Sequence, residues 1–128
     1  MLRDGKRAAV LAAGAVAAEA VGACALLAGK AIHPAVYSVP YLKPMDAAFI
    51  RRAAREFELI VTVEEHTVLG GLGGAVSEIL AELDRHAPLL RLGLRDAYND
   101  TAGSQQYLRE LHGLSARQIA RRVWEAIA

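Results

Sequence analysis

Three adjacent side chains, Glu64, Glu65 and His66, form the group in this chain whose types and spacing best suit chemistry. A carboxylate beside an imidazole can transfer protons or supply two metal ligands. No third ligand stands nearby, because the other histidines fall in unrelated segments. We therefore expect a carboxylate of this group to accept backbone N–H groups of the following turn and so fix it. A role in an interface with another protein is the next alternative.

A glycine-dense turn follows these residues, with glycine at positions 70, 71, 73 and 74. A dinucleotide fingerprint counted from Gly71 would need glycine or alanine where Val76 stands, and no Gly-Lys-Ser/Thr follows. Free N–H groups at a helix start attract anions, but two upstream glutamates would oppose a phosphate. Close packing of a helix against a strand or a neighbouring subunit explains the glycines better. The candidate interface or loop-fixing residues are therefore Glu64, Glu65, His66, Gly70, Gly71 and Gly73.

The elements on either side of this turn must position it. Leu59–Val63 is a continuous apolar run, as expected of a parallel strand that is covered on both faces. The segment Gly73–Asp84 is predicted to be a helix, because apolar residues recur there at helical spacing on one face. This order places the glutamates at the carboxyl end of a buried strand, where open α/β sheets usually carry their functional groups.

Strands and helices alternate along the rest of the chain. Further strands are predicted at Arg7–Ala12, Ala35–Val39 and Leu89–Leu92, and a further helix at Val16–Gly29. This alternation predicts a single three-layer α/β/α domain over residues 1–128, with a mostly parallel sheet of about four to five strands.

Capping residues mark several helix boundaries. Asp46 is predicted to be the N-cap of a helix that buries Ile50. Near the C-terminus, Gly113 is predicted to be the C′ glycine of a short helix that Ser104 would cap. The segment Ser115–Gln118 has the pattern of a capping box. The last helix, which follows it, is expected to bury Ile119, Ala120, Val123 and Ile127.

The composition excludes several classes of function. A net charge of +1 gives no overall field to attract nucleic acid or an anionic membrane. The single cysteine, Cys24, excludes an internal disulfide and fits a reducing compartment, so a cytoplasmic location is expected. The apolar run Ala8–Ala28 has some features of a membrane segment, yet Glu19 near its middle would cost ~3 kcal/mol in a bilayer. A strand, a glycine turn and a helix describe it better, with export or membrane tethering as the alternative.

Several motifs carry a family resemblance. VTVEEH at 61–66, GGLG at 70–73 and VSE at 76–78 resemble the signature of the C-terminal domain of transketolases, which depend on thiamine diphosphate. Supporting matches are GK at 5–6 with VLAAG at 10–14, KPMD at 43–46, RLGL at 91–94 with Asp96, and LRE at 108–110 with GL at 113–114. The related 1-deoxyxylulose-5-phosphate synthases and 2-oxo acid dehydrogenase beta subunits carry a looser version.

This resemblance implies a division of labour between domains. The complete enzymes move a two-carbon ketol unit from a ketose to an aldose, using thiamine diphosphate and Mg²⁺ at a centre that two other domains build. The family's Gly-Asp-Gly diphosphate motif is absent from this chain. The resemblance therefore implies a non-catalytic C-terminal domain or subunit that binds no cofactor alone. Its implied partners are diphosphate-binding and pyrimidine-binding domains in a dimeric assembly, contacted through the Glu64–Gly74 turn and the Tyr98–Gly103 loop.

Other readings stay open at this point. The chain could be the C-terminal part of a 1-deoxyxylulose-5-phosphate synthase or of a 2-oxo acid dehydrogenase beta subunit. It could also be a stand-alone anion or nucleotide-binding module that uses the glycine-rich helix start. Its start at Met1 fits either a natural subunit of a split enzyme or an excised domain.

Overall fold

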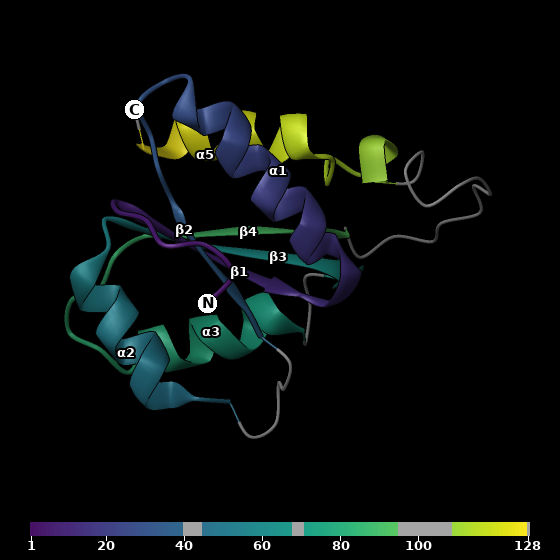
Figure 1. Ribbon diagram of the computed structural model, residues 1–128. Helices are drawn as coiled ribbons and strands as arrows, with labels where there is room; N and C mark the ends of the chain where they lie inside the picture. The colour runs from purple at the N-terminus through teal and green to yellow at the C-terminus, as the bar shows by residue number, and fades with distance from the viewer. Residues whose placement is uncertain (40–44, 68–70, 95–108, 128) are drawn as a thin grey trace.

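The computed structural model describes residues 1–39, 45–67, 71–94 and 109–127, and these contain one four-stranded sheet. The strand order is β2-β1-β3-β4, and every neighbouring pair is parallel (Figure 1). The strands are β1 (Ala8–Ala13), β2 (Ala35–Ser38), β3 (Leu59–Thr67) and β4 (Leu89–Leu94). The predicted parallel sheet is therefore confirmed, with the apolar strands β1 and β3 at its centre.

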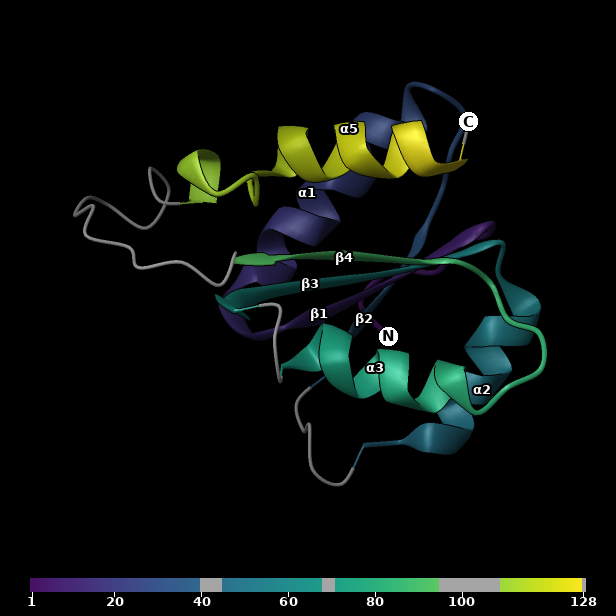
Figure 2. The same cartoon turned by 180° about the vertical axis from the view of Figure 1, so that it is seen from behind.

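Helices cover both faces of the sheet, as Figures 1 and 2 show. One face carries α1 (Ala17–Ala28) and α5 (Ala116–Ile127), and the other carries α2 (Ala47–Glu56) and α3 (Leu72–Ala81). Alternate residues of β1 serve the two layers, because Val10 packs in the α1/α5 core and Leu11 in the α2/α3 core. The three-layer α/β/α prediction is confirmed.

The predicted helix caps within the described residues form as expected. The Asp46 carboxylate accepts the Phe49 backbone N–H at 3.0 Å and begins α2. Gly113 has a φ of +77°, and the Leu114 N–H bonds to the Arg109 carbonyl at 2.7 Å, as in a helix that ends at a left-handed glycine. Ser104 and the Tyr98–Gly103 loop lie outside the described residues.

The predicted bounds of β3 were too short. The strand runs to Thr67 instead of ending at Val63, so Glu64, Glu65 and His66 lie within it. Backbone pairing explains the extension, because Glu64 pairs with Ala13 of β1 and Thr67 pairs with Leu94 of β4 after a register shift. Polar side chains do not end a strand whose backbone still has partners on both sides.

Helix α3 is shorter than predicted, since it ends at Ala81 rather than Asp84. Its last turn tightens, with the N–H groups of Glu82 and Leu83 bonding to carbonyls three residues back. The apolar stripe continued past the helix because Leu83 still packs against the core. The periodicity therefore marked burial correctly and the helix end wrongly.

The apolar segment Ala8–Ala28 divides as expected. It contains strand β1, a 3-10 turn at Gly14–Val16 and helix α1. Among the described residues, no helix combines the length and the apolar character needed to cross a bilayer.

Candidate interface site at the carboxyl end of the sheet

The Glu64 carboxylate binds the start of α3. Its side chain comes from the central strand β3, and the residue is only 2% exposed. Oε1 accepts the backbone N–H of Leu72 at 2.8 Å and Oε2 accepts that of Gly73 at 2.7 Å. The first amides of a helix have no partner inside it, and they carry the positive end of the helix dipole. Glu64 satisfies two of them and places a negative charge beside that end.

This arrangement bears on anion binding at the glycine-rich turn. The amides of Leu72 and Gly73, which a phosphate would use at this helix start, already donate to Glu64. A phosphate would have to displace a buried carboxylate from two hydrogen bonds and place its own negative charge beside that carboxylate. The start of α3 therefore suits an internal carboxylate better than a bound phosphate.

Gly73 allows the helix to approach the sheet closely. A Cβ at this position would lie 2.7 Å from Nε of Arg91 and 3.0 Å from Oγ1 of Thr62, which come from neighbouring strands. Any larger residue would push the first turn of α3 away from the sheet and strain its bonds to Glu64. Gly71 is the N-cap residue of α3, and Gly70 lies outside the described residues.

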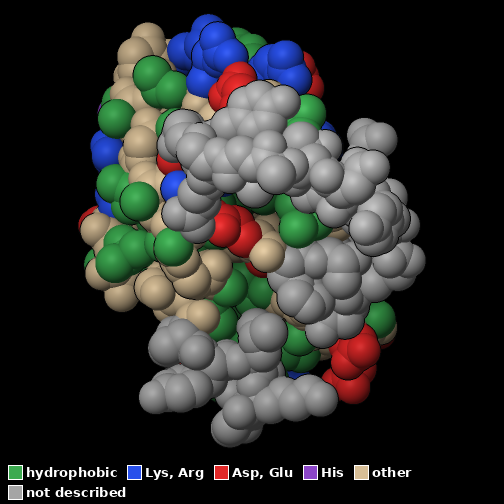
Figure 3. All heavy atoms as spheres, turned by 90° about the vertical axis from the view of Figure 1, so that its right-hand side faces the viewer, with side chains coloured by type: hydrophobic (Ala, Val, Ile, Leu, Met, Phe, Trp, Pro, Cys, Tyr) green, Lys and Arg blue, Asp and Glu red, His purple; other side chains and the backbone are tan. Residues whose placement is uncertain are grey.

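The next residue of β3 faces the opposite layer. Glu65 forms an ion pair with Arg109, whose side chain is 11% exposed. The alternation of a strand explains the split, since successive side chains point to opposite faces. Acidic side chains are visible among apolar ones in the middle of this end of the molecule (Figure 3). His66 lies on β3 beside them, and its side chain is outside the described residues.

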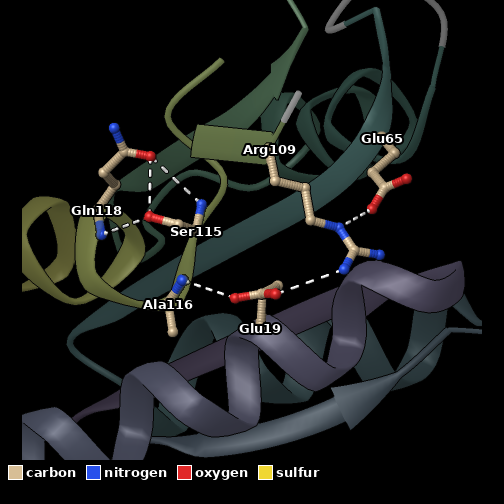
Figure 4. Close-up of polar contacts among 6 residues, drawn as sticks. All are labelled: Glu19, Glu65, Arg109, Ser115, Ala116 and Gln118. Carbon is tan, nitrogen blue, oxygen red and sulfur yellow. Dashed lines mark hydrogen bonds and ion pairs between the residues drawn. The ribbon is translucent and has the colours of Figure 1, made fainter. Parts of the chain in front are cut away.

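Arg109 also contacts Glu19 of α1, at 3.4 Å between Nη1 and Oε1 (Figure 4). The other oxygen of Glu19 accepts the backbone N–H of Ala116, the first residue of α5, at 2.8 Å. The Glu19 side chain is 15% exposed. The chain Glu65–Arg109–Glu19 thus joins β3, α1 and the start of α5 through charge-assisted hydrogen bonds.

The predicted capping box of α5 is adjacent to this network. Ser115 donates its hydroxyl to Oε1 of Gln118 at 2.9 Å, and the same oxygen accepts the Ser115 backbone N–H at 3.4 Å (Figure 4). The Gln118 N–H in turn donates to the Ser115 hydroxyl at 3.4 Å. This reciprocal pattern confirms the capping box. It fixes α5 at the same corner as Glu19.

Glu19 and Arg109 lie outside the set of predicted site residues. In the sequence, Glu19 is a lone charge in an apolar segment, and Arg109 is part of a family motif. The pair is 90 positions apart, so no local spacing connects them. A signal did exist, because a single charge in an apolar helix usually has a buried partner.

The described residues do not fit thiamine diphosphate. They contain no group of three or more His, Cys, Asp or Glu side chains that could hold its metal ion. The helix start that could receive a diphosphate carries Glu64 instead.

A pocket of about 470 Å³ lies at the amino ends of β1 and β2, lined by Asp4, Gly5, Lys6, Arg7, Ala31 and His33. Its Arg7 is already paired with Glu58.

Comparison with known proteins agrees with the fold and the motifs. The 1-deoxy-D-xylulose-5-phosphate synthase of Chlorobium luteolum is 42% identical over 98% of this chain, which spans 20% of that protein. The 6-deoxy-6-sulfo-D-fructose transketolase subunit SqwH of Clostridium sp. is 39% identical over 98% of this chain, which spans 38% of that subunit. The chain is therefore much shorter than either relative.

Solved structures give the same result. A structure described as a split gene transketolase, inactive beta4 tetramer, superposes with a TM-score of 0.88 at 35% identity, covering 98% of this chain and 41% of that one. A transketolase from Pichia stipitis shares the fold, with a TM-score of 0.67 at 16% identity. The family described as "Transketolase, C-terminal domain" matches residues 1–119. The chain belongs to the transketolase C-terminal domain family.

Proposed function

We propose that this chain is the non-catalytic C-terminal domain or subunit of a transketolase-type enzyme, acting as one domain over residues 1–128. Its task is to support assembly of the enzyme. The observation that carries the proposal is the Glu64 carboxylate on the first two amides of α3. The start of α3 is thus held from within the chain. Of the candidate interface or loop-fixing residues, the buried Glu64, Gly71 and Gly73 suit the loop-fixing role, and we infer that Glu65, His66 and Gly70 contact a companion domain.

The companions follow from the size of the relatives. The chain spans 20% of a related synthase and 38% of a related transketolase subunit, so most of each enzyme lies outside it. Diphosphate-binding and pyrimidine-binding domains supply the remainder. They would hold thiamine diphosphate and Mg²⁺, and these groups would supply the chemistry of two-carbon transfer.

Two split relatives favour ketol transfer and self-association. One is named a transketolase subunit, and the other a split-gene transketolase whose chains form an inactive tetramer. An inactive tetramer of one chain type is what an assembly subunit without its catalytic companion would form. We infer that this chain also forms homo-oligomers in the cytoplasm, with no nucleic acid or membrane partner.

A second candidate is the C-terminal domain of a 1-deoxyxylulose-5-phosphate synthase. The observation in its favour is the 42% identity to such a synthase over 98% of this chain. The transketolase subunit shares 39% over the same fraction. The two identities are too close to separate the reactions, so the products of the assembled enzyme must do so.

The test is reconstitution. The diphosphate-binding and pyrimidine-binding domains encoded in the same genome are assayed with and without this chain, for ketol transfer from xylulose 5-phosphate and for formation of 1-deoxyxylulose 5-phosphate. We expect activity only when all parts are present. We expect no heat when thiamine diphosphate is titrated into the isolated chain.

Two results would contradict the proposal. One is full activity of the companion domains without this chain, since that would remove its role in assembly. The other is turnover by the isolated chain, which would place the reaction centre inside it. Formation of 1-deoxyxylulose 5-phosphate alone would support the second candidate over the first.

A further inference from the structure

The pocket at the amino ends of β1 and β2 is built from two segments that are distant in sequence. Residues 4–7 lead into β1 and residues 31–33 lead into β2. The two segments meet where the Lys6 backbone N–H donates to the His33 carbonyl at 2.6 Å. Gly5 permits this contact, because a Cβ there would lie 2.3 Å from the same carbonyl oxygen. The pocket volume of about 470 Å³ suits a small molecule.

Each of the two segments holds a strained backbone position that lines this pocket. Arg7 has a φ of +71°, and a 2.9 Å hydrogen bond between its two neighbours makes it the centre of a γ-turn with positive φ, which is rare and strained. Ala31 has a φ of +58° beyond the end of α1, where the Ile32 N–H bonds back to the Leu27 carbonyl at 3.1 Å. This helix-ending pattern usually carries glycine.

These two positions are informative because they occur together. Among the described residues, Arg7 and Ala31 are the non-glycine positions with positive φ, and both line the same pocket. Strained positions of this kind cluster at ligand sites, where the surrounding structure holds them in place. The strain therefore indicates that the shape of this pocket serves binding.

Three side chains that can donate to an anion line the pocket. The Lys6 ammonium and the His33 ring form no hydrogen bond or ion pair with the rest of the described chain. Arg7 binds Glu58 and a backbone carbonyl through Nε and Nη2, which leaves its Nη1 to donate elsewhere. Against these groups stands one acidic residue of the lining, Asp4.

We propose that this pocket binds a phosphate monoester that carries hydroxyl groups. A phosphate monoester has three terminal oxygens, one for each of the donors Lys6, Arg7 and His33. Asp4 supplies an acceptor for a hydroxyl, because Oδ1 takes a backbone N–H at 2.9 Å and Oδ2 has no partner among the described residues. The pocket lies at the opposite end of the strands from Glu64, so it is separate from the companion surface proposed above.

The experiment titrates the full chain and locates the bound ligand. Glucose 6-phosphate and adenosine 5′-monophosphate both carry a phosphate and hydroxyl groups, and their relative affinities distinguish a sugar phosphate from a nucleotide. Glucose is the control without a phosphate. By calorimetry we expect at least one ester to bind with a dissociation constant below about 1 mM, and glucose not to bind. Amide NMR shifts should change most at residues 4–7 and 31–33, and not at Leu72 or Gly73, whose amides bind Glu64.

Lys6→Gln tests one of the donors, and Lys30→Gln is its matched control. Lys30 is exposed and adjacent to Ala31 in the chain, but it does not line the pocket. We expect Lys6→Gln to raise the dissociation constant at least about tenfold, and Lys30→Gln to change it by less than about twofold. Lys6 is also exposed, so thermal unfolding of its variant should match that of the wild type.

Asp4→Asn tests the acceptor. This change removes a negative charge that opposes phosphate and turns one acceptor of the side chain into a donor. Inorganic phosphate should therefore bind the variant at least as tightly as the wild type, whereas the preference for the hydroxylated ester over inorganic phosphate should fall.

Three results would overturn the inference. They are no binding of either ester at about 10 mM, shift changes that centre on Leu72 and Gly73, and equal affinities of the wild type and Lys6→Gln. The shift changes are measured on the wild-type chain, so they decide even if a variant folds poorly. These titrations need no companion domain, so their failure is distinguishable from a failure of the reconstitution assay.

Discussion

Glu64 and Gly73 are joined by a buried 2.7 Å hydrogen bond from the backbone N–H of the glycine to the carboxylate. The bond ties the end of a central strand to the first turn of the following helix. It requires a carboxylate that reaches across the turn and a residue at 73 that leaves room for Thr62 and Arg91. Glu64 and Gly73 thus link β3 to α3. The carboxylate and the glycine can be replaced separately to test this link.

Replacing Glu64 by glutamine should weaken this link between β3 and α3. Glutamine keeps one oxygen acceptor but loses the charge and turns the second acceptor into a donor that faces the Gly73 N–H. Hydrogen bonds to charged groups contribute about 1.5–3 kcal/mol, so Glu64→Gln should lower the free energy of unfolding by that amount. Urea denaturation measures the change.

Glu78→Gln is the control for this substitution. Glu78 is exposed on the same helix, so its variant should stay within about 0.5 kcal/mol of the wild type. Equal stability of Glu64→Gln and Glu78→Gln would show that the buried carboxylate does not hold α3 in place.

Two neighbouring glycines should respond oppositely to alanine. At position 73 a Cβ would meet Arg91 Nε at 2.7 Å, whereas at position 74 the nearest atom is Arg91 Nη2 at 3.9 Å. Gly73→Ala should destabilise the fold by about 1–3 kcal/mol through overpacking. Gly74→Ala should be neutral or stabilise by up to about 1 kcal/mol, because alanine favours the helix. Thermal unfolding measures the stability of both variants. A Gly73→Ala variant as stable as the wild type would contradict the close approach of α3 to the sheet.

The link between β3 and α3 could be predicted from the sequence only in part. Apolar runs predicted a mostly parallel sheet of about four to five strands, and capping residues predicted the helix starts at Asp46 and Ser115. They also led us to expect a carboxylate of the Glu64–His66 group that accepts backbone N–H groups of the following turn. They could not predict that β3 continues through Glu64, because that depends on pairing with β1 and β4, which are distant in sequence. The Glu19–Arg109 contact escaped for the same reason. Local patterns report burial and chain direction, while contacts between distant segments depend on the assembled sheet.

The Glu19–Arg109 pair should be energetically coupled. Both side chains are mostly buried and Glu19 also holds the Ala116 N–H, so removing one partner leaves a charge poorly compensated. A double-mutant cycle with Glu19→Gln and Arg109→Met should give a coupling energy of about 0.5–3 kcal/mol. Urea denaturation of the four proteins measures it.

The exposed pair Arg121–Glu125 provides the reference for this cycle. Its side chains are 68% and 59% exposed and its atoms are 3.9 Å apart, so coupling there should not exceed about 0.5 kcal/mol. If the two cycles gave the same coupling energy, the Glu19–Arg109 pair would stabilise the fold no more than an exposed ion pair does.

Cys24 should make stability fall at alkaline pH. Burial raises the pKa of its thiol above the ordinary value, and this effect outweighs the lowering by the positive charge of Arg3. As pH rises, the unfolded chain therefore ionises first, at about pH 8.5, while the folded chain keeps its proton. The unfolded state then binds fewer protons than the folded state, so the free energy of unfolding declines from that pH upward.

Two measurements check this behaviour. Urea denaturation between about pH 7.5 and 9.5 should show a decline that Cys24→Ala makes shallower, because alanine removes the titrating group. A thiol reagent should also label Cys24 at least about a hundredfold more slowly in the folded chain than in urea, because only the thiolate reacts and it forms rarely in a buried site. Rapid labelling of the folded chain would show instead that helix α1 opens readily and exposes Cys24.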